Sequence, residues 1–340
     1  MSQQKRLFLL DAYALIFRGY YAFIKNPRIN SKGMDTSAIM GFTNSLLDVI
    51  KRERPDHLAV CFDKGGSASR TEMYTEYKAN RDETPEAIRI AVPYIQQILE
   101  AMHIPVVVKE GFEADDIIGT LAKQAEKEDY QVFMVTPDKD FAQLVSENIF
   151  MYRPARMGNG IEIWGIPEVQ EKFEVERPEQ VIDYLGMMGD AIDNIPGLPG
   201  VGDKTAKKFI KAYGSMEGLL EHTNELKGKL KEKIEANKAL GILSKQLATI
   251  LLDVPYNSMP KTMNLASQMK PQWVHFLKNW NLEEWLRTSK KSFPLKELRI
   301  RLRSKLPQKK LPPNKGNSLI FLPLLEAGLH QKIKLPNDKI

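Results

Sequence analysis

Short apolar runs that end in an aspartate recur along the first half of this chain. The runs and their acids are Leu7–Leu10 with Asp11, Leu58–Phe62 with Asp63, and Val132–Val135 followed closely by Asp138. Runs of this length, separated by helical patterns, are typical of parallel strands, whose carboxyl ends meet at one edge of a sheet where ligands bind. The recurrence therefore predicts a pocket at that edge that gathers carboxylates around cations.

The alternation of strand and helix patterns sets the fold class. Strands are expected at 7–11, 58–63, 104–108, 132–136 and near 149–152, and helices at 36–52, 86–102, 114–128 and 139–146. This order predicts an α/β fold with a mostly parallel central sheet flanked by helices. From about 165 to 256 the pattern is helical. We therefore expect an α/β domain at 1–165 with an excursion at about 64–95 that is polar over 64–83, a helical subdomain at 166–286, and a tail at 287–340.

The net charge of +6 comes from that tail. Residues 287–340 hold 14 Lys and Arg against 3 Asp and Glu, whereas residues 1–286 hold 35 against 40. Within the tail, residues 305–318 are rich in Lys, Pro, Gln and Asn, a composition typical of disorder. Whole-chain charge is therefore no argument for nucleic-acid binding, which must be argued from local sites.

Composition also predicts the compartment. No apolar stretch is long enough to span a membrane, and the start runs directly into a strand, so no secretory signal is expected. The single cysteine, Cys61, excludes a disulfide within the chain. Its place in an apolar run predicts a buried, inert thiol. A cytoplasmic protein is expected.

Nine acids are candidate metal ligands: Asp11, Asp63, Glu113, Asp115, Asp116, Asp138, Asp140, Asp190 and Asp193. Glu113 and Asp116 are three residues apart, on one face of a helical turn, and Asp190 and Asp193 share this spacing. Oxygen ligands suit Mg²⁺ or Mn²⁺, and the few histidines lack zinc spacing. Two such ions about 3.5–4 Å apart can hold the attacking and leaving oxygens of a phosphodiester displacement. For any single pair, complementing a helix dipole stays the alternative.

A glycine-rich turn follows the last acids. The sequence IPGLPGVGDKTA at 195–206 has the form of a helix–hairpin–helix, whose glycines and free N–H groups would contact the DNA backbone without reading its sequence. An ordinary interhelical turn stays the alternative, whereas a nucleotide-binding P-loop is rejected because no strand precedes it. The expected DNA contacts are Gly197, Gly200, Gly202, Lys204, Lys207 and Lys208.

The excursion after Asp63 is polar and basic, and long excursions in compact domains are often functional. Cations within it could neutralise charge that develops on a scissile phosphate, although a solvated basic loop is the alternative. Earlier in the chain, an aromatic side chain followed by an arginine could stack on an unpaired base, with a core phenylalanine as the alternative. The candidates are Arg70, Tyr77, Lys78 and Arg81 in the excursion, and Phe17 and Arg18 in the helix after the first strand.

Together these stretches resemble the 5′-nuclease domain of bacterial DNA polymerase I, within the flap endonuclease superfamily. The resemblance spans residues 6–256 and is most specific at EYKANR (76–81), GFEADD (111–116), TPDKD (136–140) and MGDAIDNIPG (188–197). It implies a PIN-like or resolvase-like sheet followed by a helix–hairpin–helix subdomain. The family usually has Asp-Gly where this chain has Asp11-Ala12, which is compatible with a backbone that is not left-handed.

The resemblance also implies roles for the candidate residues. Asp11, Asp63, Glu113, Asp115 and Asp116 would form the tighter metal site, with Asp138 shared or adjacent, and Asp140, Asp190 and Asp193 the second. Lys78 and Arg81 would lie in an arch, or clamp, and contact the scissile phosphate. Phe17 would lie near the terminal bases and Arg18 near a phosphate, while the turn at 197–202 would bind duplex DNA and hold a K⁺ ion.

The implied function is a metal-dependent, structure-specific 5′-3′ exonuclease and 5′-flap endonuclease in primer removal and DNA repair. Its partner would be DNA with 5′ ends, flaps or nicks, with RNA primers left open, and the chain would act as a monomer. Two alternatives stay open: a non-cleaving DNA-binding module and a small phosphoryl hydrolase. The tail at 287–340 resembles nothing in the family and is interpreted as a frame-shifted end of a truncated DNA polymerase I, or as the DNA-gripping tail of a standalone nuclease.

Overall fold

The structure, a computed structural model, describes residues 4–154 and 160–256, which lie within one compact unit, Met1–Leu295. The described strands form one sheet in the order β3-β2-β1-β4-β5-β6. Their bounds are β1 Arg6–Asp11, β2 His57–Phe62, β3 Val106–Val108, β4 Gln131–Val135, β5 Ile149–Arg153 and β6 Glu162–Trp164. All neighbours pair in parallel except β5 with β6. The expected mostly parallel sheet is therefore confirmed.

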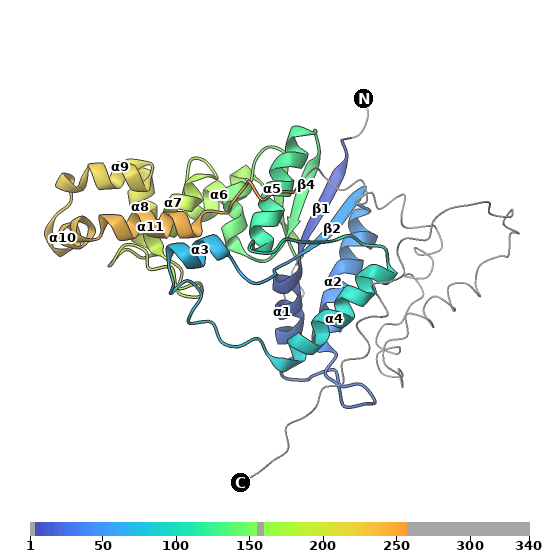
Figure 1. The fold of residues 1–340 in the computed structure, drawn as a ribbon. Coiled ribbons are helices and arrows are strands. Elements are labelled where there is room, and N and C mark those ends of the chain that lie inside the picture. Colours follow the sequence, from blue (N-terminus) through green and yellow to red (C-terminus); the bar gives the residue numbers. More distant parts are fainter. Residues whose placement is uncertain (1–3, 155–159, 257–340) are drawn as a thin grey trace, which may run out of the picture. The chain divides into compact units, whose positions relative to one another are not determined.

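Helices cover both faces of the sheet, which is why its central strands are apolar throughout (Figure 1). Residues Leu7–Leu10 of β1 are fully buried. Helix α5 (Ala114–Lys127) packs across β1 to β5, whereas α1 (Ala12–Ala22), α2 (Ser37–Glu53) and α4 (Glu86–Ala101) pack on one another and on β1, β2 and β3. The chain moves outward from β1 to β3 and then returns to β4, so the connection direction reverses between β1 and β4. Ligand crevices form at such switch points.

The second half of the unit is helical, as expected. Its elements are α6 Ile166–Phe173, α7 Gln180–Met188, α8 Asp203–Tyr213, α9 Met216–Glu221, the 3₁₀ turn η2 Thr223–Glu225, α10 Gly228–Ala236 and α11 Lys238–Ala248. Helix α7 contacts α8, α9 and α11, and also the 3₁₀ turn η1 (Lys139–Leu144) of the first half. A Cβ on Gly186 would lie 2.7 Å from the Cα of Lys245, so only glycine allows α7 and α11 to pack this closely.

Three elements differ from expectation. Strand β6 is new: its three residues are too few to show an alternating pattern, and it forms by antiparallel pairing with β5. The segment expected as a helix at 139–146 is the 3₁₀ turn η1. The excursion at 64–95 contains a short helix, α3 (Ala68–Met73), before α4 begins at Glu86.

The expected end of the helical subdomain and the tail at 287–340 lie outside the described residues. Within the described ranges, none of the helices combines the length and the apolar character needed to cross a bilayer.

Candidate active site

Asp11 and Asp138 lie at the carboxyl ends of β1 and β4, the two neighbouring strands between which the order of connections reverses. Asp11 ends β1, and its carboxylate accepts hydrogen bonds from the Ala14 backbone N–H and the Thr136 hydroxyl, both at 3.1 Å. Asp138 follows β4 and accepts from the backbone N–H of Asp140 at 3.0 Å. Because Thr136 Oγ1 also accepts from the N–H of Asp138 at 3.2 Å, one threonine ties the two strand ends together.

The start of α5 adds three carboxylates, and Asp63 joins them from the end of β2. Asp63, just after β2, accepts from the backbone N–H of Ala114 at 2.8 Å and so joins its strand end to this helix. Glu113, Asp115 and Asp116 each offer an oxygen, and these oxygens lie within 4.8 Å of one another. Three carboxylates this close repel strongly unless cations share the site.

The remaining pair comes from the turn between α7 and α8. Asp190 and Ile195 exchange two backbone hydrogen bonds of 2.9 and 2.8 Å, which close a tight loop that holds Asp190 and Asp193 together. The Nζ of Lys139 lies 3.5 Å from Asp190 Oδ2. This ion pair joins the helical half of the unit to the segment that carries Asp138 and Asp140.

Burial and the charges of neighbouring carboxylates raise the pKa values of several of these acids. Burial, strengthened by the charges of Asp63 and Asp138, raises the pKa of Asp11 to about 7. Burial also raises the pKa of Asp115 well above its usual range, and the nearby charges of Asp116 and Glu113 act in the same direction.

Asp140, Asp190 and Asp193 form a second group of acids, whose charges act on Asp138 and on one another. Burial raises the pKa of Asp140 well above its usual range, and the charges of Asp138, Asp190 and Asp193 contribute. One oxygen of Asp140, Oδ1, is buried without a hydrogen-bond partner. A buried carboxylate oxygen without a donor, among other carboxylates, fits a cation. Since every donor in the set is an oxygen, hard divalent cations such as Mg²⁺ or Mn²⁺ fit best.

Two cations of the excursion lie at the rim of this cluster. Lys78 Nζ is 2.6 Å from Glu113 Oε1 and 3.5 Å from Asp193 Oδ2, and Arg81 pairs with Asp193. The backbone of Lys78 is left-handed, with φ 57°, a strained conformation that clusters at functional sites. Amide side chains fix this loop as well: Asn80 donates to the Ala191 carbonyl at 2.7 Å.

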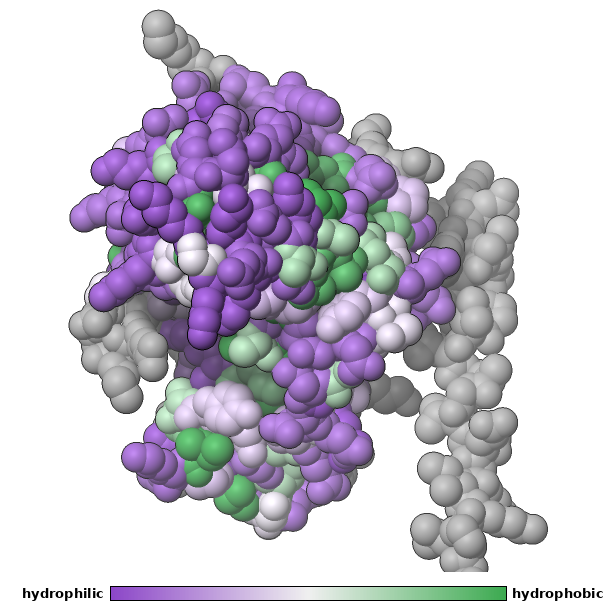
Figure 2. Space-filling model, turned by 90° about the vertical axis from the view of Figure 1, so that its left-hand side faces the viewer, coloured by the Kyte–Doolittle hydropathy of each residue, from purple (hydrophilic) through white to green (hydrophobic). Residues whose placement is uncertain are grey.

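The hairpin turn presents a different surface. Gly197 is buried and donates its N–H to Ser244 Oγ at 2.9 Å; a Cβ there would lie 2.6 Å from the Gly189 nitrogen. Gly200 and Gly202 are exposed instead, and a Cβ on Gly202 would meet nothing within 4 Å. The face that holds this helical half is mainly hydrophilic (Figure 2). On α8, Lys204 and Lys208 are exposed, whereas Lys207 pairs with Asp203 at 3.3 Å and with Glu174 at 3.7 Å.

Comparisons with known proteins show to which family the chain belongs. The domain described as "5′-3′ exonuclease, N-terminal resolvase-like domain" matches residues 6–174, and "5′-3′ exonuclease, C-terminal SAM fold" matches residues 176–271. The chain belongs to the 5′-3′ exonuclease family. The resemblance inferred from residues 6–256 is thereby confirmed.

Relatives of this exonuclease-family chain are considerably longer. DNA polymerase I of Bacillus subtilis is 41% identical over 257 residues, which are 75% of this chain and 29% of the relative. DNA polymerase I of Rhizobium leguminosarum is 38% identical over 286 residues, which are 82% of this chain and 28% of the relative. The chain therefore spans less than a third of the length of these relatives.

Solved structures show the same fold. The T5 D15 protein co-crystallised with metal ions has a TM-score of 0.59 at 19% identity, over 88% of this chain and 99% of that one. The T5 5′-exonuclease with bound divalent zinc ions gives the same values. Ala12, which replaces the glycine usual in the family, is the first residue of the right-handed helix α1, so its backbone needs no glycine.

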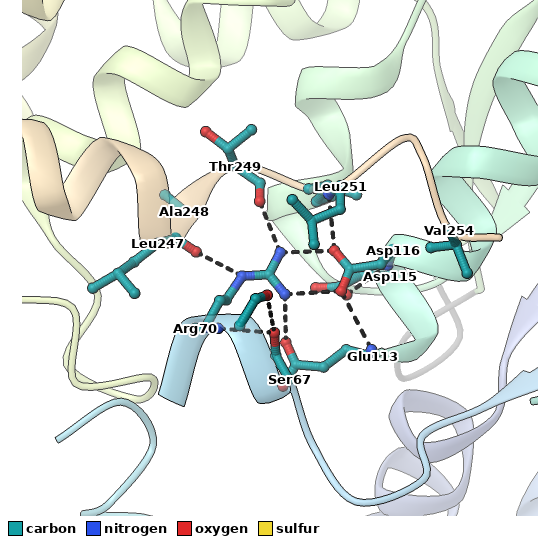
Figure 3. A network of polar contacts seen from close by, with 12 residues as sticks. Ser67, Arg70, Glu113, Asp115, Asp116, Leu247, Ala248, Thr249, Leu251 and Val254 are labelled. Atoms are coloured by element: carbon teal, nitrogen blue, oxygen red, sulfur yellow. Dashed lines mark hydrogen bonds and ion pairs between the residues drawn. The ribbon is translucent and has the colours of Figure 1, made fainter. Parts of the chain in front are cut away.

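Two expected DNA contacts of the exonuclease-family site are instead internal. Arg70 is 3% exposed, and its guanidinium donates to Glu113, to Asp116 and to two backbone carbonyls (Figure 3). Tyr77 is 7% exposed, and its hydroxyl donates to Glu113 at 3.0 Å. Neither position suits the predicted contact with DNA, because a phosphate would have to displace interactions with buried groups.

Asp116 is similarly enclosed. Oδ1 accepts from Arg70 Nη2 at 2.7 Å and from the Leu251 N–H at 2.8 Å, while Oδ2 accepts from Arg70 Nη1 at 2.9 Å and from the Glu113 N–H at 3.3 Å. A carboxylate offers about four lone-pair positions. Asp116 therefore adds charge to the cluster while its own oxygens are already hydrogen-bonded.

Phe17 and Arg18 lie on α1, outside the acid cluster. Phe17 is half-buried and stacks on Tyr21, with ring centroids 6.3 Å apart, in a row that begins with Tyr13. Arg18 is half-buried and approaches Ser45 Oγ at 3.5 Å. An aromatic row of Tyr13, Phe17 and Tyr21 therefore runs along this helix.

Sequence reasoning missed Thr136, Lys139 and Gln143, all close to the acids. Thr136 and Lys139 stand inside the TPDKD stretch and were within reach of that motif. No pattern in the sequence marks Gln143 as part of the site, because its partners Ala248 and Ile250 follow more than a hundred residues later.

Proposed function

We propose that this chain hydrolyses phosphodiester bonds of DNA at 5′ ends and 5′ flaps, with divalent cations held by the acid cluster. The observation that supports this proposal is geometric: Glu113, Asp115 and Asp116 offer oxygens within 4.8 Å of one another, and Lys78 Nζ lies between Glu113 and Asp193 of the helical half. Binding DNA alone gains nothing from such a concentration of negative charge.

The cations would be held in two groups. Asp11, Asp63, Glu113 and Asp115 supply the donors of the first, with Asp138 between, and Asp140, Asp190 and Asp193 supply those of the second. Bound Mg²⁺ or Mn²⁺ would supply Lewis acidity and neutralise charge on the transferred phosphate. Asp116 would act through its neighbours, because its own oxygens already accept four hydrogen bonds.

The chain's own side chains would orient the substrate. Water adds to phosphorus as the bond to the 3′ oxygen breaks, leaving a 5′-phosphate and a 3′-hydroxyl. Lys78 and Arg81 would exchange their carboxylate partners for the phosphoryl oxygens, whose charge they stabilise as it builds. Phe17 would stack on a base of the 5′ strand and Arg18 would contact a neighbouring phosphate.

Duplex DNA would lie on the hairpin. Gly200 and Gly202 are open to solvent, and α8 begins directly after them, so free N–H groups and the helix dipole favour a phosphate there. Lys204 and Lys208 would extend this contact, and a K⁺ ion would bridge the turn and the DNA. The relatives' name, DNA polymerase I, and a T5 flap endonuclease complex "with DNA and metal ions" support the proposed role in primer removal and repair, in which the chain would act as a monomer.

The test is cleavage of a labelled 5′-flap duplex by the purified chain, with Mg²⁺ and then with excess chelator. We expect a product with a 5′-phosphate that appears only with Mg²⁺. DNA binding without cleavage would favour the non-cleaving module, and cleavage unaffected by chelator would remove the metal from the proposal. Hydrolysis of small phosphate esters but not of the flap would favour the small phosphoryl hydrolase.

A further inference from the structure

The end of α11 and the three residues after it cross the elements that carry the metal acids. Residues 247–251, here called the brace, have no strand partner, and side chains from α3, α5 and η1 satisfy their backbone groups. Figure 3 shows the contacts of Arg70 and Asp116 with this segment. Buried backbone groups without partners are rare and costly, so these side chains and the brace depend on each other.

The first contact of the brace is with Arg70. Nε donates to the Leu247 carbonyl at 3.1 Å and Nη2 to the Thr249 carbonyl at 2.7 Å, while Nη1 and Nη2 hold Asp116 at 2.9 and 2.7 Å. Nη1 also donates to Glu113 at 3.1 Å. One planar guanidinium thus fixes the brace and the acids at the start of α5 in a single geometry.

The second contact is with Gln143, which is 4% exposed. Its Nε2 donates to the Ala248 carbonyl and to the carbonyl of Asp140, both at 3.0 Å, and its Oε1 accepts from the Ile250 N–H at 3.0 Å. Gln143 therefore connects the backbone of Asp140, an acid of the second group, to the brace. Arg70 connects the same segment to Glu113 and Asp116 at the start of α5.

The brace is continuous with the hairpin. Ser244, one turn before the brace, accepts the N–H of Gly197 at 2.9 Å, and a Cβ on Gly241 would lie 2.8 Å from Leu198. Helix α11 therefore contacts the hairpin turn through Gly241 and Ser244, and it ends one turn later in the brace.

We propose that the brace holds the two groups of metal acids in register with each other and with the hairpin, and that Arg70 and Gln143 are positioning residues for cation binding. This inference rests on the proposed function. Residues that orient ligands in this way change metal affinity by about 10- to 100-fold when removed. They act without touching the metal or the DNA.

The experiment uses Gln143→Met, which keeps the side-chain volume but leaves Ala248 and Ile250 without partners. Gln180→Met is the matched control. Gln180 is 5% exposed and also bridges three backbone groups, donating to the Gly214 carbonyl and accepting from the N–H groups of Glu176 and Arg177. Both variants lose a buried glutamine that bridges three backbone groups, but only one lies beside the brace.

Calorimetric titration of the whole 340-residue chain with Mn²⁺ measures its affinity for the cation, and thermal melts with chelator measure stability. We expect both variants to melt earlier, and only Gln143→Met to bind Mn²⁺ at least about 10-fold more weakly. Equal Mn²⁺ affinity in the two variants, with the unmodified chain binding normally, would overturn the inference and leave the proposed function standing. If the unmodified chain bound no Mn²⁺, both would fall.

A milder pair covers the case in which Gln143→Met does not fold. Gln143→Asn keeps the amide one methylene shorter, and Arg70→Lys keeps the charge but loses the planar fork. Each is expected to weaken Mn²⁺ binding while the melt shows a folded protein. Full affinity in both folded variants would contradict the positioning role.

Discussion

Arg70 and Lys78 lie eight residues apart in one basic excursion, yet the structure places them in opposite settings. Arg70 is 3% exposed and donates to two acids and two carbonyls, whereas Lys78 is at the rim, where its Nζ lies between Glu113 and Asp193. Both are cations paired with metal-site acids. The difference shows that burial, rather than charge or position in the sequence, separates a cation that stabilises the site from one that can exchange its partner for substrate.

The largest expected effect is on the stability contributed by the buried cation. Arg70→Met should lower the free energy of unfolding by about 3–5 kcal/mol, because it leaves Asp116, fully buried, without its counter-charge. Urea unfolding with chelator measures this loss. Arg81→Met, which removes a half-exposed cation from the same excursion, is the control and should cost much less. Equal losses would remove the distinction between the two settings.

A second prediction concerns pH and the acids that both cations face. The pKa of Asp11 is about 7 in the folded, metal-free protein and near 3.8 unfolded. The folded state therefore holds the proton more tightly, so the group's contribution to stability is complete below about pH 4 and is lost as pH rises toward 7, by about 4 kcal/mol. Asp11→Asn should flatten this decline in urea unfolding curves measured with chelator. A variant that declines as steeply as the unmodified chain would contradict the assignment.

A third prediction tests the exchange of partners at the rim. Lys78→Ala should slow flap cleavage by about 10²–10³-fold, because a donor to the developing charge is lost. Binding of the same flap, measured by fluorescence anisotropy with Ca²⁺ in place of Mg²⁺, should change far less. If binding weakens as much as cleavage slows, Lys78 only grips DNA.

The smallest effect distinguishes two lysines of α8. Lys204 is exposed, but Lys207 already pairs with Asp203 and Glu174. Lys204→Ala should reduce the slope of log affinity against log salt for duplex DNA by about 1, and Lys207→Ala should reduce it less. The reverse order would show that intramolecular ion pairs are no guide to which lysines contact DNA.

Much of the fold and of the acid cluster could be predicted from the sequence, because both leave patterns among residues that are close together in the chain. Asp11 and Asp63 end or follow apolar runs, and Glu113 begins a helix, so strand and helix periodicity alone brings them to one edge of the sheet. Predicted strand ends differ from those observed by two residues or fewer in the five expected strands.

The remainder depends on contacts between distant parts of the chain. Arg70 was assigned to DNA because a basic loop predicts exposure, but its partner Leu247 is 177 residues away. Gln143 has no charge and no motif, and its role depends on where α11 ends. Strand β6 forms only because β5 offers an edge.

Anomalous diffraction from crystals soaked in Mn²⁺ tests the central claim most directly. The account predicts two manganese peaks about 3.5–4 Å apart, one bounded by Asp11, Asp63, Glu113 and Asp115 and the other by Asp140, Asp190 and Asp193. Peaks confined to the protein surface, with no manganese among these carboxylates, would contradict it.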